Sequence, residues 1–106
     1  MPNNFKIIYK ILSILEKAMS YDEFDTDKIS YQKLDISKAL WIRIMVMLKE
    51  NGYIKGVVVT ETLDSQLPDV ELGNVEITLK GLEYLEENSL MQKAKNLAKG
   101  VVDIVK

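Results

Sequence analysis

The segment SKALWIRIMVML, residues 37–48, occupies the position of a DNA-reading helix. A short turn, LDIS at residues 34–37, precedes it, and the β-forming run VVV at residues 57–59 follows it. Helix, turn, helix and strand in this order are typical of a helix-turn-helix followed by a hairpin wing. Between Ala39 and Leu48, however, Arg43 is the only polar residue. A helix that lies against phosphates usually carries more positive charge, so position and composition favour different functions.

Upstream of this segment the sequence predicts a long helix over residues 3–19. Asn3 or Asn4 can cap its start, because a short polar side chain accepts hydrogen bonds from free backbone N–H groups. One face collects apolar residues at three- and four-residue steps. That face comprises Phe5, Ile8, Ile11, Leu12, Leu15 and Met19, whereas Ile7 and Ile14 fall on the polar side and need a cover of their own.

A polar connector, residues 21–27, leads to a short predicted helix over about residues 27–33, with Ile29 and Leu34 inward. Ser37 is expected to cap the central helix, and Gly52 to end it, since glycine adopts positive φ freely.

The second half of the chain predicts a hairpin followed by helices. Strands are expected over residues 53–61 and 75–79, with residues 62–74 as their loop. Thr78 is expected to cap a helix over residues 79–88, and Ser89 to start another. The last helix carries an apolar stripe opposite four lysines, formed by Leu90, Ala94, Leu97, Val101 and Ile104 or Val105.

These elements predict an α+β fold, a winged helix with a C-terminal helical extension. We expect residues 1–89 to form the winged-helix domain. Residues 90–106 are expected to form an amphipathic helix that packs on this domain or on a partner. Its apolar residues are mostly small and include no Trp or Phe, so packing is favoured over membrane binding.

Composition excludes several classes of function. The 106 residues fit one domain, and the absence of cysteine and histidine removes disulfides, cysteine-bound zinc and the commonest general base. We therefore expect no enzyme, no cofactor and no small-molecule substrate. No apolar run is long enough for a membrane span, and the N-terminus does not resemble a signal peptide, so we expect a cytoplasmic protein that makes no membrane contact.

Charge is unevenly distributed along the chain. The net charge is −2, yet residues 1–19, 37–56 and 90–106 carry +2, +3 and +3. The predicted wing, residues 57–80, carries −4 and has no basic residue before Lys80. A wing of this charge repels phosphate, and a solvated hairpin is the better interpretation of it.

The chain resembles the YjcQ family, small winged-helix proteins of Gram-positive bacteria and their prophages. The resemblance covers nearly the whole chain and is most specific in the final block, ITLKGLEYLEENS. It rests on residues 4–12, residues 15–19, Tyr21-Asp22, Trp41, residues 52–54 and residues 77–89. The resemblance implies a winged helix in a phage-linked cytoplasmic setting; it implies no established activity and no functional residues.

Two kinds of surface are candidates on and near the central helix. On a helical projection Trp41, Ile44, Met45 and Leu48 share the core face. The basic residues Lys33, Lys38, Arg43 and Lys49 are the candidate DNA contacts. The apolar residues Ala39, Ile42 and Val46 are a candidate protein interface, or a surface covered by another helix. The apolar excess favours packing over DNA contact for this surface.

The acidic run Asp22, Glu23, Asp25 and Asp27 does not match a calcium loop, which needs fixed ligand alternation and a central glycine. Helix capping by Asp25 or Asp27 is the better interpretation. Two functional hypotheses therefore stand. The first is a prophage-linked, dimeric winged-helix protein that binds double-stranded DNA and regulates transcription. The second is a winged-helix module for homodimer or other protein contact without DNA.

Overall fold

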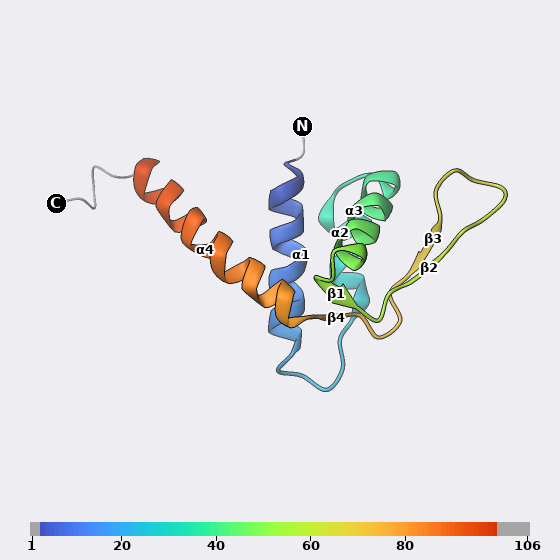
Figure 1. The fold of residues 1–106 in the computed structure, drawn as a ribbon, viewed down its shortest axis with the longest axis horizontal. Coiled ribbons are helices and arrows are strands. Elements are labelled where there is room, and N and C mark those ends of the chain that lie inside the picture. The colour runs from blue at the N-terminus through green and yellow to red at the C-terminus, as the bar shows by residue number, and fades with distance from the viewer. Residues whose placement is uncertain (1–2, 100–106) are drawn as a thin grey trace.

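The part of the chain that the structure describes forms four α-helices and two short pairs of antiparallel strands, an α+β arrangement (Figure 1). The computed structural model describes the backbone of residues 3–99 and the side chains of residues 3–89. The helices are α1 (Asn4–Ala18), α2 (Tyr31–Leu34), α3 (Lys38–Glu50) and α4 (Leu79–Lys99), with a 3-10 turn at Thr26–Ile29. The strands are β1 (Ile54–Lys55), β2 (Val58–Thr60), β3 (Asp69–Glu71) and β4 (Glu76–Ile77).

Short polar side chains start the helices, as predicted. The Asn3 side chain accepts hydrogen bonds from the backbone N–H groups of Phe5 and Lys6 at the start of α1. Ser37 accepts from the Leu40 N–H at 3.1 Å at the start of α3. Gly52 has a φ of +79° just beyond α3, so its predicted role is confirmed.

The region predicted as one short helix over residues 27–33 is two elements. Asp25 caps the 3-10 turn by accepting from the Asp27 N–H, and Ser30 then caps α2 by accepting from the Lys33 N–H. Because Ser30 has an extended backbone, it interrupts the helix that the sequence pattern suggested.

The wing is one hairpin interrupted at its middle. Near its base β1 pairs with β4, and further out β2 pairs with β3, both antiparallel. The predicted strand over residues 53–61 is therefore wrong as a single element, and β3 lies in the region predicted as loop. Gly56, with a φ of +82°, causes the break, and a Cβ there would meet the Asn74 backbone.

The buried face of α1 is rotated from the predicted one. Ile11, Leu12 and Leu15 are buried as expected, but Ile7 is buried as well and Phe5 is 73% exposed. The inward placement of Phe5 and of Met19, which is also exposed, was wrong. The physical reason is that α1 packs against α4 as well as α3, so its apolar contacts extend around the helix.

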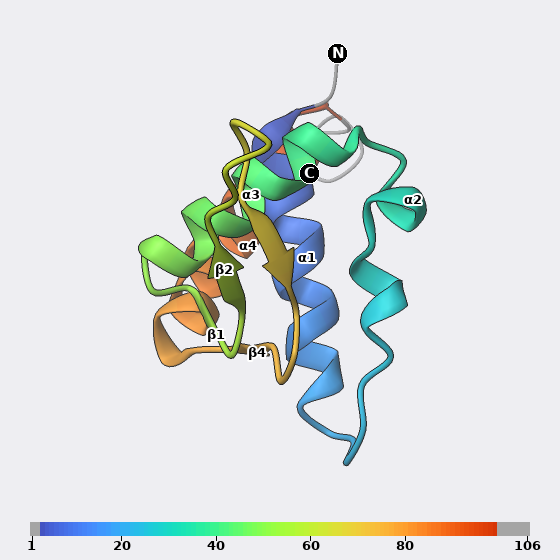
Figure 2. The ribbon, with the colours of Figure 1, turned by 90° about the vertical axis from the view of Figure 1, so that its right-hand side faces the viewer.

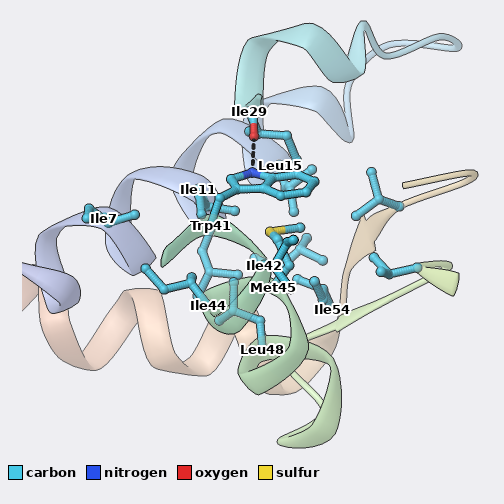
Figure 3. Close-up of a cluster of buried hydrophobic side chains, with 14 of the residues drawn as sticks. Ile7, Ile11, Leu15, Ile29, Trp41, Ile42, Ile44, Met45, Leu48 and Ile54 are labelled. Atoms are coloured by element: carbon cyan, nitrogen blue, oxygen red, sulfur yellow. Dashed lines mark hydrogen bonds between the residues drawn. The ribbon is translucent and has the colours of Figure 1, made fainter. Parts of the chain in front are cut away.

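One core connects the helices to the base of the wing (Figure 3). Trp41, Ile44, Met45 and Leu48 line it from α3, as predicted. In Figure 3 the Trp41 indole points toward the 3-10 turn, where its N–H donates to the Ile29 carbonyl at 2.8 Å. The arrangement of helices and wing is compatible with a winged helix.

α4 is a single helix through Ser89, where a new helix was expected. Its first turns lie against α1 and β4, with Leu85 buried, and its later turns then diverge from α1 (Figure 1). Residues 100–106 of the predicted C-terminal segment lie outside the described residues, so its packing on the domain or on a partner stays a prediction. None of the described helices is both long enough and apolar enough to cross a membrane.

Candidate nucleic-acid interface

The turn between α2 and α3 determines where the candidate basic residues lie. α2 ends at Leu34, and Asp35 follows in the left-handed conformation with a φ of 58°. The N–H groups of Asp35 and Ile36 then bond to carbonyls of α2, and Ser37 starts α3. This three-residue turn has the length expected for a helix-turn-helix. It places Lys33 just before the turn and Lys38 just after it, and both side chains are exposed.

Arg43 lies on the outer face of α3, where it is exposed. Met47, one turn further along, is 44% exposed, and Glu50 is exposed at the end of the helix. Ala39 and Val46 are half-buried along the flank of this face. The outer face therefore has one cation at its centre and an apolar side chain beside it.

The four candidate DNA contacts do not form one cluster. At 3.6 residues per turn, Lys38 lies roughly 140° around α3 from Arg43, although its position at the first turn leaves its long side chain free to reach. Lys49 is exposed but lies about 16 Å along the helix axis from Lys38. Lys33 and Lys38 thus flank the turn at the start of α3, Arg43 lies about one and a half turns further along on another side of the helix, and Lys49 lies near its C-terminal end.

Ile42 is buried, with 7% of its surface exposed, so its assignment to an open protein interface was wrong. The reason is that α3 packs against β3 of the wing as well as against α1 and β1. Figure 2 shows the outer hairpin lying alongside α3. The buried side of α3 consequently includes Ile42 in addition to the four residues predicted, and Val46 lies at its edge.

Met47 is a surface residue that sequence reasoning missed. No clear signal for its exposure was available in the sequence, because Met47 lies three residues from Ile44 and so only about 60° around the helix from it, at the edge of the core face. Treating Ile42 as open shifted the predicted outer face toward Val46 and away from Met47.

Positive charge near α3 is not neutralised by ion pairs within residues 3–89. The one salt bridge there joins Lys55 to Glu76 at 3.7 Å across β1 and β4, and both side chains are largely exposed. The acidic connector caps a helix turn through Asp25, and among the described residues no group of acidic side chains is placed to hold a metal ion.

The described residues form a small α+β structure in which a three-residue turn joins α2 to α3 and an acidic hairpin lies beside α3. The chain belongs to the YjcQ family, since a family model described as YjcQ protein matches residues 9–104. Comparison with curated proteins and with solved structures gives no match. This match confirms the resemblance to the YjcQ family that the sequence indicated.

Proposed function

We propose that this protein is a winged helix that binds double-stranded DNA through Lys33, Lys38 and Arg43, without catalytic activity. The observation that supports this is the open outer face of α3. Figure 1 places α4 on the other side of α1 from α3, so the described part of the C-terminal extension does not cover that face. Regulation of transcription in a phage-derived setting, which the family resemblance implies, is the biological role that we propose for such binding.

Binding in this mode relies on phosphate contacts more than on base contacts. Arg43 is the chain's only arginine, and arginine is the side chain best suited to bidentate recognition of guanine. The wing strands carry Asp69, Glu71 and Glu76 and repel phosphate. We therefore expect weak affinity, low sequence preference and steep dependence on salt.

Fluorescence anisotropy with a mixed-sequence labelled duplex tests the proposal. Three phosphate contacts give a slope of about −2.7 in a plot of log affinity against log salt concentration. Arg43→Ala and Lys38→Ala should each weaken binding and reduce the magnitude of the slope by about 0.9. Lys49→Ala is the matched control on the same helix and should change neither quantity.

Absence of binding at about 100 μM protein in low salt would overturn the proposal, because non-specific DNA binders have dissociation constants near or below that value. Equal loss in Arg43→Ala and Lys49→Ala would instead show that overall charge governs binding, and would exclude the interface proposed here.

The exposure of Met47 favours a second candidate, a protein-binding surface on α3. Met47→Lys distinguishes the two. It adds a cation beside Arg43 and should strengthen DNA binding if this face contacts phosphates. A substitution that leaves DNA affinity unchanged would favour the protein-binding alternative, because the face would then not lie against the duplex.

A further inference from the structure

A groove of about 690 Å³ lies at the end of the molecule away from the N-terminal half of α3. The end of α1, the connector after it and the segment leading into β4 form its walls. Figure 1 shows these segments together at the lower end of the view. Its floor contains Leu15, Val75 and Ile77, each with at most 5% of its surface exposed. Met19 and Tyr21 line it as well and are 60% and 73% exposed. Large exposed apolar side chains around an apolar floor indicate a contact surface.

The groove is acidic. Asp22, Glu23 and Glu76 line it, and no basic residue does. Glu76 is partly balanced by Lys55 at 3.7 Å, but both of those side chains are in solvent, so the pair contributes little. A matching occupant therefore needs an apolar stripe and positive charges beside it.

The C-terminal segment of the same sequence has this chemistry. Residues 90–106 contain four lysines and one acidic residue, for a net charge of +3. Leu90, Ala94 and Leu97 recur at helical spacing within it. Opposite charges on two apolar surfaces steer them together and exclude like-charged partners.

The segment cannot reach the groove of its own chain. Its helix starts at Leu79, two residues after Ile77 of the groove, and diverges from α1 toward Lys99 (Figure 1). Twenty residues of helix carry Lys99 about 30 Å from Leu79. Seven further residues span at most about 24 Å when extended, which is too short to return.

We propose that the acidic groove binds residues 90–106 of a second copy of this chain, so that two chains exchange C-terminal segments. Each groove receives the partner's apolar stripe, and Asp22 and Glu23 lie against the partner's lysines. The exchange is symmetric and closes as a dimer. It leaves the outer face of α3 free in both copies and does not depend on DNA binding.

A charge exchange tests the dimer. The groove variant carries Asp22→Lys and Glu23→Lys, and the segment variant carries Lys93→Glu and Lys95→Glu. In each variant alone, like charges face each other at both contacts, so self-association should weaken at least about tenfold. In an equimolar mixture both contacts again join opposite charges, and heterodimers should form with near wild-type affinity.

Sedimentation velocity at low and moderate salt measures each species, and circular dichroism checks that the variants fold. The control variant, Glu61→Lys with Asp64→Lys on the exposed wing, makes the same change in net charge away from the groove and should dimerise like wild type. A wild-type protein that is monomeric at roughly 200 μM would overturn the proposal. So would variants that dimerise unchanged, or a mixture that stays monomeric. DNA anisotropy on the same variants separates this result from the proposed function, because neither variant alters Lys33, Lys38 or Arg43.

Discussion

The indole N–H of Trp41 donates a hydrogen bond of 2.8 Å to the backbone carbonyl of Ile29, and both residues are buried. The bond joins α3 to the 3-10 turn that precedes α2. The ring of Tyr31 lies beside the indole, with 6.1 Å between ring centroids. Together these contacts hold the 3-10 turn and α2 against α3, so the orientation of the outer face of α3 depends on them.

Trp41→Phe tests the energetic weight of this bond. The change leaves the Ile29 carbonyl buried without its donor and removes part of a core side chain. We expect the free energy of unfolding to fall by about 2–4 kcal/mol, from the unsatisfied acceptor and the lost packing. Urea denaturation followed by circular dichroism measures it.

Tyr31→Phe is the matched control, since it keeps the aromatic ring beside the indole and does not involve the hydrogen bond between Trp41 and Ile29. It should change stability by less than about 1 kcal/mol. A Trp41→Phe protein as stable as wild type would show that the hydrogen bond does not hold the turn.

Thr78 joins the end of α3 to the start of α4. Its hydroxyl donates to the Gly52 carbonyl and accepts from the Gly81 N–H at 3.1 Å. Thr78→Val keeps the shape and removes both bonds, so we expect a loss of about 1–3 kcal/mol in urea denaturation. Thr78→Ser keeps the hydroxyl and should retain most of the stability; equal losses in the two variants would show that the two hydrogen bonds contribute no more to stability than the methyl group does.

Gly81 allows α4 to approach the wing base closely. A Cβ at Gly81 would meet the Tyr53 carbonyl oxygen and lie 2.6 Å from Cγ1 of Ile77. Inside a helix alanine is more favourable than glycine by about 1 kcal/mol, so Gly81→Ala would stabilise α4 if nothing lay close to this position. We expect destabilisation by about 2 kcal/mol or more, because overpacking must move backbone.

Gly52→Ala is the comparison, because its Cβ would meet only the flexible Lys80 side chain at 3.8 Å. Gly52→Ala should therefore lower the free energy of unfolding only by the cost of placing alanine at a positive φ, about 1 kcal/mol. In thermal denaturation the melting temperature of Gly81→Ala should be lower than that of Gly52→Ala. The reverse order would contradict the close approach of α4 to Tyr53 and Ile77.

Local chemistry made the helix starts predictable. The caps at Asn3, Ser37 and Thr78 depend on residues within three positions along the chain, so the sequence alone determines them. The core face of α3 was predictable for a similar reason, since Trp41 and Leu48 share one side of a regular helix.

Burial that depends on distant neighbours was not predictable. Ile42 is covered because β3 packs on α3. The sequence indicated that Ile7 needs a cover, but not that α4 is the element that packs on α1. The acidic groove likewise combines the connector with residues near β4, about 50 positions apart in the sequence. Periodicity within one helix carries no information about such contacts.

The raised pKa of the Tyr84 phenol leads us to expect a loss of stability at high pH. Burial raises the pKa of its phenol above the ordinary value of 10.0, and the nearby Tyr53 raises that pKa further. Tyr84 is therefore still protonated in the folded protein at a pH where the unfolded chain has lost the proton. Unfolding then releases a proton, so this contribution to stability is full below pH 10 and is lost as pH rises through the folded pKa.

Tyr84→Phe removes this titration and should make the free energy of unfolding less dependent on pH above about 10. Urea denaturation of wild type and variant at several pH values from about 8 to 11 measures the difference, and lysine titration, common to both proteins, cancels in it. Tyr21→Phe is the control, because the Tyr21 side chain is 73% exposed. Parallel pH curves for wild type and Tyr84→Phe would mean that the Tyr84 phenol is as well solvated in the folded protein as in the unfolded chain, and that the first turns of α4 do not pack as closely on Tyr53 as the ring separation of 5.3 Å indicates.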